Sequence, residues 1–339
     1  MPELRIDPLS GHRTIVAGER SRRPGGEPRS KPADPIDPQN DPFAEGHEDR
    51  TPPELYALRD EGSPPNSPGW RVRVVPNLYP ALSPPGPDDP HPPAAVEEQP
   101  GGRGGTPQEL FISLPATGGH EVIVNGPESV TSLAELPREQ VVEAVATWQE
   151  RMRTHEGSAY VQLIVNERVE AGASLPHTHA QLYALDFVPG EVARERERAS
   201  AYTTRTMGGS LLGDVIAEEV RRGERVVAID DEAVLVAPWA SRLPFQLMLA
   251  PRRPRPRFED GGPSGAALLH EGLCRLARHL GSSPPLNMWV RTAPQGAEDF
   301  CWRIDVMPRL THLAGLELST GLSLNIVSPE QAAAALRDC

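Results

Sequence analysis

Short segments rich in apolar residues, many of them β-branched, recur in the first half of the chain. Short runs of this kind are typical of β-strands. The segments are 13–17, 71–75, 120–124, 160–165 and 181–185. Residues 137–155 instead have apolar side chains at helical spacing, and the opening proline suits a first helical turn. This half is therefore predicted to combine strands with one long helix.

The second half of the chain repeats this plan. Strand-like segments are expected at 234–238, 245–249 and 287–290, and a helix at 265–280, after a largely helical stretch at 189–221. Two copies of one unit are implied. The predicted fold class is α+β, with two tandem units, each a mostly antiparallel sheet with packed helices. The expected domains are residues 1–186 and 187–339.

Two regions fall outside these patterns. Residues 21–70 are rich in Pro, Gly, Asp and Glu and are predicted to form an extended loop. Residues 81–108 are a low-complexity Pro/Gly stretch, expected to be a mobile insertion.

His177, His179 and Gln181 follow each other at alternate positions ahead of a predicted strand. Extending that strand backward places the three side chains on one face. A neutral imidazole can attack phosphorus at neutral pH, and the small residues Gly172 to Ser174 would let backbone N–H groups approach a phosphate. The same pair could also be a metal site or merely half-exposed polar residues. Residues 301–305 hold the matching place in the second half without histidines, so one catalytic centre per chain is expected.

Charge and composition narrow the possible partners. The 339 residues have a formal net charge of −13, which argues against nucleic acid or an anionic membrane surface as a partner. Anionic substrates would need local arginines. Cys274, Cys301 and Cys339 are widely spaced and form no disulfide framework. Without an apolar leader or a span of about 18 apolar residues, a cytoplasmic protein is expected.

Several motifs together resemble one family. The central one joins Asn166, Gly172-Ala173-Ser174 and Pro176-His177-Thr178-His179-Ala180-Gln181. Others are Arg20-Ser21-Arg22-Arg23-Pro24, Asp41-Pro42-Phe43-Ala44-Glu45-Gly46-His47-Glu48, Val75-Pro76-Asn77-Leu78-Tyr79-Pro80, His120-Glu121-Val122-Ile123-Val124 and the C-terminal segments 315–317 and 328–331. Together they resemble the galactose-1-phosphate uridylyltransferase family of the histidine-triad superfamily. Hydrolases of that superfamily have a third histidine where this chain has Gln181.

The resemblance implies a two-step reaction through a nucleotidyl-histidine. His179 would attack the α-phosphorus of a nucleoside-diphosphate sugar, and a second sugar 1-phosphate would then take the nucleotide. A backbone carbonyl is expected to hold the other ring nitrogen of His179. Gln181 would donate to a phosphate oxygen, and His177 would complete the catalytic set. Ser174 and Asn166 would bind phosphoryl oxygens, although Asn166 could instead cap a turn.

The resemblance also implies substrate-binding residues away from the strand. Arg20 and Arg23 would pair with phosphate, Asn77 would contact ribose, and Glu317 would accept hydrogen bonds from sugar hydroxyls. Surface charge and an ordinary turn are the plain alternatives for the arginines and for Asn77. Family members are homodimers in which early arginines approach the partner's active centre, so a homodimer with shared sites is expected.

The family's metal sites are altered here. Many members hold zinc through positions that read Asp41, Ala44, Ser129 and His177 in this chain. Alanine cannot ligate, and one histidine with one carboxylate is a poor zinc site. His47 could substitute only by rearrangement. A second metal site of some members reads Cys301 and Arg303 here, so no metal or cofactor is predicted.

The leading functional prediction is a nucleotidyltransferase that moves a nucleoside monophosphate, UMP by resemblance, between an NDP-hexose and a hexose 1-phosphate. Its substrates would be a UDP-sugar and a sugar 1-phosphate. Thr311, His312 and Leu316 replace residues of the family's sugar-binding end, which leaves the sugar open. One alternative is a phosphorylase of ADP-glucose or of a dinucleoside polyphosphate. The other is a non-catalytic nucleotide-sugar binding protein, which would need neither His179 nor Gln181.

Overall fold

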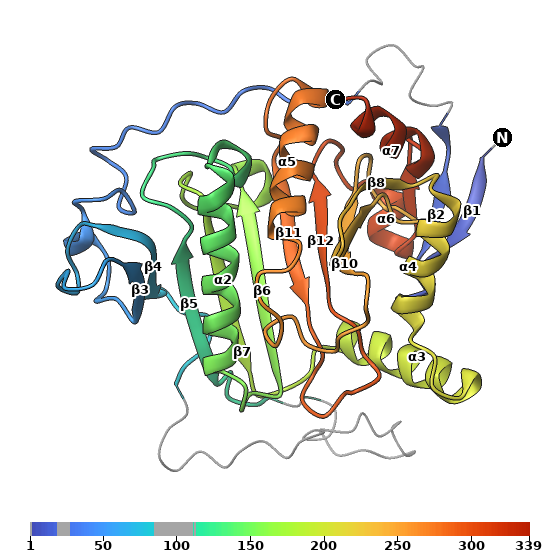
Figure 1. Cartoon of the computed structure of the whole chain (residues 1–339), viewed down its shortest axis with the longest axis horizontal. Coiled ribbons are helices and arrows are strands. Elements are labelled where there is room, and N and C mark those ends of the chain that lie inside the picture. Colours follow the sequence, from blue (N-terminus) through green and yellow to red (C-terminus); the bar gives the residue numbers. More distant parts are fainter. Residues whose placement is uncertain (1, 19–27, 85–110, 112) are drawn as a thin grey trace.

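The computed structural model describes residues 2–18, 28–84, 111 and 113–339 (Figure 1). Arg20 and Arg23 lie outside the described residues, as does most of the predicted insertion at 81–108.

One large antiparallel sheet organises the described chain. It is a ten-stranded sheet in the order β3-β4-β5-β7-β6-β11-β12-β10-β9-β8, and its neighbouring strands pair antiparallel. The strands are β3 (Tyr56–Arg59), β4 (Trp70–Pro76), β5 (Gly118–Val124), β6 (Tyr160–Glu167), β7 (His179–Leu185), β8 (Val226–Ile229), β9 (Ala233–Val236), β10 (Leu247–Pro251), β11 (Leu286–Arg291) and β12 (Arg303–Pro308).

The sheet contains the predicted duplication. Three strands, a helix and two strands occur in each half, with α2 (Arg138–Thr154) in the first and α5 (Ala266–Leu280) in the second. Read inward from either edge, the strand order is the same, and β6 pairs with β11 where the halves meet. The predicted fold class is therefore confirmed.

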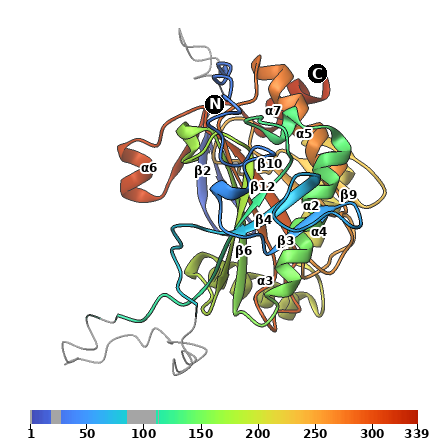
Figure 2. The same cartoon turned by 90° about the vertical axis from the view of Figure 1, so that its left-hand side faces the viewer.

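Helices α2 and α5 cover the same face of the sheet (Figures 1 and 2). Val141, Val145 and Trp148 of α2 enter one apolar core with Leu182 and Ala184 of β7. Because side chains alternate along a strand, the odd-numbered residues of β7 face away from α2. His179 and Gln181 therefore lie on the face that the two helices leave uncovered.

Further elements lie around this sheet. A separate sheet joins β1 (Glu3–Ile6), β2 (Arg13–Val16) and β13 (Ser323–Asn325), so the first strands lie beside the end of the chain. The other helices in the described residues are α3 (Gly190–Thr206), α4 (Leu211–Arg222), α6 (Gly315–Thr320) and α7 (Pro329–Arg337), with short 3-10 turns η2 (Glu48–Arg50), η3 (Leu133–Glu135) and η4 (Val169–Ala171). The division at residue 186 stays a prediction.

Some predicted boundaries were wrong. The extended loop expected over 21–70 contains β3, whose Leu58 packs against the core. Strand β7 begins at His179, so His177 lies in the preceding loop. No helix of the described residues is long and apolar enough to cross a membrane.

Candidate active site

The candidate site lies at the start of β7, between β5 and β6. The register places Val124 opposite His179 on one side. On the other side, Ile164 pairs with Gln181. Continuing that register brings Asn166 beside His179 on the same face. Three predicted site residues therefore meet through strand pairing alone.

His179 is held in one orientation by the chain that precedes it. Its ring Nδ1 lies 2.7 Å from the carbonyl oxygen of His177, so Nδ1 carries the hydrogen and donates it. Within the described residues Nε2 has no hydrogen-bond partner, and it keeps its lone pair. Burial lowers the pKa of the imidazole, which favours the neutral form. The carbonyl expected at this nitrogen is present, and the role of His179 as nucleophile stays a prediction.

His177 has different surroundings. Its side chain is fully buried, with Nδ1 at 2.7 Å from Asp41 Oδ2 and Nε2 at 2.9 Å from the carbonyl oxygen of Gly126. Both nitrogens face oxygen acceptors, so both donate. Burial alone would raise the pKa of the Asp41 carboxyl, but the hydrogen bond and charge of His177 outweigh it and hold the pKa below its usual value. The His177 ring is thus committed to Asp41, and its carbonyl is what positions His179.

The positions of the family's zinc ligands come together without fitting a metal. Ser129 donates its hydroxyl hydrogen to Asp41 Oδ2 at 2.7 Å, and Asp41 Oδ1 accepts the Phe43 N–H at 2.9 Å. Both ring nitrogens of His177 are already bonded, and Ala44 has no donor atom. Among the described residues, no group of three or more His, Cys, Asp or Glu side chains is arranged to hold a metal ion.

His47 belongs to the same loop but adds no ligand. Its Nδ1 lies 2.7 Å from the backbone oxygen of Asp41, which keeps the ring on the loop's own backbone. The residues present here fit a hydrogen-bonded joint and do not fit a zinc site.

The loop before His177 differs from the expectation in one respect. The N–H groups of Gly172 and Ala173 already donate to Val169 and Arg168 carbonyls, at 3.0 and 3.1 Å. The backbone N–H groups of Ser174 and Leu175 have no partner within the described chain, so these later amides are the ones open to a phosphate. The predicted cradle is therefore shifted toward the exposed Ser174.

Backbone strain marks the beginning of that loop. Arg168 has φ of +72°, a region that non-glycine residues rarely adopt, and Gly172 has φ of +89°. The Arg168 side chain fixes the turn by donating to the backbone oxygen of Lys31 at 2.6 Å and to that of Ser283 at 3.2 Å. The loop is thus tied to two distant segments.

Two predicted asparagines lie at the site. Asn166 accepts a hydrogen bond from Asn287 Nδ2 at 2.7 Å, so it is held by β11 and does not cap a turn. Asn77 follows β4, accepts the Tyr79 N–H at 2.9 Å and lies 3.0 Å from the Nε2 of His120. Both asparagines thus have their side-chain oxygens engaged, and Nδ2 of Asn77 faces the His120 ring.

Glu317 is not brought to this site. It lies on the exposed helix α6 and accepts the N–H of Ala314 at 3.0 Å, a local cap. Helix α6 stands away from the rest of the chain, on the side of the sheet opposite α2 (Figure 2). No contact joins Glu317 to His179 or Gln181 in the part of the chain that the structure describes.

Three residues at the site were not assigned these roles from sequence. The sequence indicates Asp41 only as a replaced zinc ligand, whereas the structure pairs it with His177. His120 and Tyr183 both contact the oxygen of Gln181, at 3.1 and 3.0 Å. The sequence alone could have placed Tyr183 near Gln181, because the two share one face of a predicted strand. It could not have placed His120 there, because the position of His120 depends on the register of β5 against β7.

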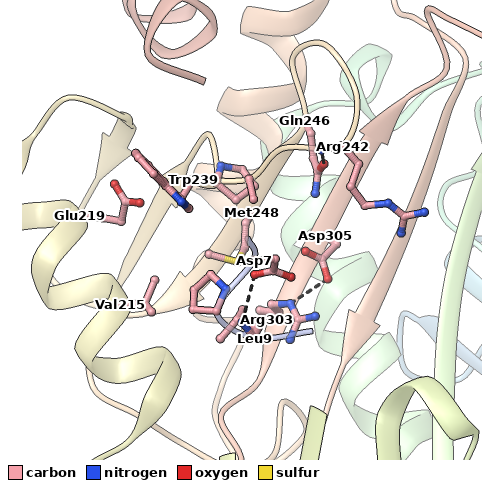
Figure 3. A pocket seen from close by; sticks show the side chains of 13 residues that line it. Asp7, Leu9, Val215, Glu219, Trp239, Arg242, Gln246, Met248, Arg303 and Asp305 are labelled. Carbon is pink, nitrogen blue, oxygen red and sulfur yellow. Dashed lines mark hydrogen bonds and ion pairs between the residues drawn. The ribbon is translucent and has the colours of Figure 1, made fainter. Parts of the chain in front are cut away.

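The corresponding place in the second half is filled by ion pairs. On β12, Arg303 pairs with Asp305 at 2.9 Å and with Glu195 of α3 at 3.0 Å. A pocket of about 50 Å³ beside them is also lined by Asp7 and Arg242 (Figure 3). It is too small for a sugar nucleotide, because even a drug-sized ligand needs about 300 Å³.

Comparison with known proteins agrees with this description. The model of the galactose-1-phosphate uridyl transferase N-terminal domain matches residues 1–189, and the model of a domain of unknown function matches residues 130–338. The chain belongs to the galactose-1-phosphate uridyl transferase family, and it is a transferase-class enzyme as its motifs predict.

Individual relatives cover the chain to different extents. An ADP-glucose phosphorylase of Arabidopsis thaliana is 28% identical over 99% of this chain and 93% of its own length. A galactose-1-phosphate uridylyltransferase of Haemophilus influenzae is 29% identical over 56% of each chain. The crystal structure of an Arabidopsis thaliana ADP-glucose phosphorylase with bound ADP-glucose superposes with a TM-score of 0.77 at 25% identity, covering 100% of this chain and 99% of that one.

Proposed function

We propose that this chain transfers a nucleoside monophosphate, UMP in the first instance, between an NDP-hexose and a hexose 1-phosphate through a nucleotidyl-His179 intermediate. The observation that supports this most is the state of His179. It is buried, which lowers its pKa and favours the neutral ring, its Nδ1–H is bonded to the His177 carbonyl, and its Nε2 lone pair is unused within the described chain.

The first step forms a bond from Nε2 of His179 to the α-phosphorus. The bond from that phosphorus to the bridging oxygen breaks, and its electron pair leaves with the hexose 1-phosphate. The amide hydrogens of Gln181 and the N–H groups of Ser174 and Leu175 stabilise charge on the phosphoryl oxygens. The His177 carbonyl supports the positive charge that develops on the ring.

The second step reverses these bonds with a new acceptor. A phosphate oxygen of the incoming hexose 1-phosphate attacks the same phosphorus, and Nε2 leaves with its electron pair. Gln181 cannot supply a proton in either step. This suits transfer to a phosphate acceptor rather than acid-assisted hydrolysis by water.

A phosphorylase is the second candidate. It uses the same first step, with inorganic phosphate in place of the hexose 1-phosphate. The near-complete coverage of the chain by an ADP-glucose phosphorylase supports it, as do the replacements at Thr311, His312 and Leu316. The non-catalytic alternative has no comparable support, because the groups around His179 are those that nucleotidyl transfer needs.

Product analysis separates the two candidates. UDP-glucose and ADP-glucose are each incubated with a hexose 1-phosphate or with inorganic phosphate, and the products are resolved by chromatography. The leading proposal expects a new NDP-hexose with the sugar phosphate as acceptor. Formation of a nucleoside diphosphate only, and only with inorganic phosphate, would replace it with the phosphorylase.

The proposal includes the assembly, the metal content and the location of the protein. We infer a homodimer in which the exposed α6 brings Glu317 to the partner's site, since Glu317 does not reach the site of its own chain. We infer that the Asp41–His177 pair replaces a structural zinc. We propose a cytoplasmic location and no nucleic-acid or membrane partner.

A further inference from the structure

Two side chains outside the predicted site converge on one atom of Gln181. Tyr183 donates its hydroxyl hydrogen to Gln181 Oε1 at 3.0 Å, and His120 Nε2 lies 3.1 Å from the same oxygen. The strand register pairs His120 directly with Tyr183, and their rings stack with centroids 4.1 Å apart. The carbonyl end of the Gln181 side chain is therefore held from two neighbouring strands.

The backbone decides which nitrogen of His120 carries the hydrogen. The N–H of Ala81 donates to His120 Nδ1 at 3.1 Å, and a backbone amide can only donate. Nδ1 must then have a lone pair, so the neutral ring has its hydrogen on Nε2. The other tautomer would satisfy only the contact with Asn77 Nδ2 at 3.0 Å and would lose those with Ala81 and Gln181.

This tautomer in turn fixes the amide of Gln181. An Nε2–H group needs an acceptor, so the oxygen of Gln181 must face His120, and the NH₂ group must face the other way. Within the described residues, that NH₂ group has no hydrogen-bond partner. If the amide were rotated by half a turn, it would set a donor against the His120 N–H and offer an oxygen to an anionic substrate.

We propose that His120, supported by Tyr183, is a positioning residue that holds Gln181 with its amide hydrogens toward the transferring phosphoryl group; this role rests on the proposed function. The sequence of contacts runs from the Ala81 N–H through the imidazole of His120 to the Gln181 oxygen. Burial lowers the pKa of His120, so the ring stays neutral at neutral pH and Nδ1 keeps its lone pair. His120 itself touches no reacting atom.

The test is a double-mutant cycle with steady-state kinetics and unfolding curves. His120→Phe keeps a ring against Tyr183 and removes both nitrogens, whereas His120→Gln restores a side-chain N–H donor. Both are made in the wild type and in Gln181→Ala. Tyr183→Phe removes the second donor to the Gln181 oxygen. It replaces His120→Phe as the test variant if His120→Phe fails to fold. His155→Phe is the matched control, because His155 lies on the α2 side and pairs with Glu121 at 2.8 Å.

His120→Phe is expected to lower kcat about tenfold with KM nearly unchanged, since losing one donor to a developing oxyanion costs a factor of about 100 or more and misorientation costs part of that. His120→Gln recovers most of the loss, and Tyr183→Phe lowers kcat in the same direction. In the Gln181→Ala background His120→Phe has no further effect on kcat. His155→Phe changes stability and leaves kcat unchanged.

Additive losses in the cycle would overturn the role, because His120 would then act independently of Gln181. A rise in KM with unchanged kcat would also overturn it and would place His120 with Asn77 in substrate binding. A wild-type protein that transfers no nucleotidyl group would remove the proposed function and this role together. If the wild type is active and His120→Phe has the same kcat, the positioning role of His120 is wrong and the proposed function stands.

Discussion

His177 and His179 have the same side chain and different tasks, and the difference comes from what each ring nitrogen faces. His177 has an acceptor at both nitrogens, a carboxylate and a carbonyl, so both nitrogens donate hydrogen bonds. His179 has one carbonyl acceptor and one open nitrogen. At the scale of single residues, one imidazole is therefore a structural anchor and the other is a neutral base with an unused lone pair.

This difference predicts the pH dependence of the reaction. Burial holds the pKa of His179 below its ordinary value of 6.5, and a protonated ring has no lone pair for phosphorus. We expect kcat/KM to be constant above pH 6.5 and to fall only at lower pH. A pH profile of kcat/KM with a narrow-range buffer series checks this, and an acidic limb centred at or above 6.5 would contradict it.

At the scale of elements, Glu167 ties the end of β6 to the loop that precedes β7. Its Oε1 accepts the Leu133 N–H at 2.7 Å and the Thr178 hydroxyl at 3.4 Å, and its Oε2 is buried without a partner in the described chain. Burial raises the pKa of this carboxyl to about 7. Thr178 lies between the two histidines, so this joint supports the site.

Glu167→Gln is expected to change stability in a pH-dependent way. The folded state binds more protons than the unfolded state between about pH 4.5 and 7, so wild-type stability falls as pH rises through that window. The variant escapes this loss and should be more stable than wild type at pH 8 by up to roughly 3 kcal/mol, with little difference at pH 5. Urea unfolding at both pH values measures it.

Glu121→Gln is the matched control for that experiment. Burial alone would raise the pKa of Glu121, but the hydrogen bonds of His155 and Arg151 outweigh it and lower the pKa. This carboxylate stabilises the fold above pH 4.5, so its replacement should destabilise the protein at pH 8. If both variants shift stability in the same direction at pH 8, the account of Glu167 is wrong.

The joint between the Asp41 loop and His177 gives a prediction about metal. We expect the purified protein to contain less than one zinc per chain and to keep its melting temperature after chelation, because the Asp41–His177 pair and Ser129 satisfy one another. Elemental analysis and a thermal scan with EDTA test this. A large drop in melting temperature on chelation would reveal a metal site, and His47 would be the first ligand to test.

Elements with a long hydrophobic pattern could be predicted from the sequence, whereas contacts between residues far apart in the chain could not. The helix at 137–155 and the strands at 120–124 and 160–165 were found because their patterns span several residues. β1, β3, β8 and β13 were missed, and each has only four residues or fewer over which a pattern could be read. For the site, the alternation of His179 and Gln181 was readable. The Asp41–His177 pair was not, because it joins residues 136 positions apart.

At the scale of the whole molecule, two equivalent halves have different contents at the same place. The first half has the histidine face on β7, whereas Arg303 and Asp305 on β12 neutralise each other in the second. One catalytic centre per chain, as expected from the sequence, stays a prediction. If α6 of a second copy completes the site, the exposed position of this helix on its own chain is explained.

Subunit mixing tests this shared site. His179→Ala and Glu317→Ala proteins are each expected to be nearly inactive, one in the nucleophile and one in the sugar contact. After subunit exchange, half of the dimers should be mixed and each should have one intact site, which restores about a quarter of wild-type activity. Light scattering verifies the dimer. A monomer, or no recovery after proven exchange, would contradict the shared site.

The most direct test of the account is the mass of the protein itself. The wild type and His179→Ala are incubated with a panel of NDP-sugars without acceptor, denatured at alkaline pH to preserve an N–P bond, and measured by intact mass spectrometry. We expect the wild type to gain one nucleoside monophosphate, whose mass identifies the base, and His179→Ala to gain none. Turnover of an NDP-sugar by the wild type with no adduct, or an adduct on His179→Ala, would contradict the nucleotidyl-His179 intermediate.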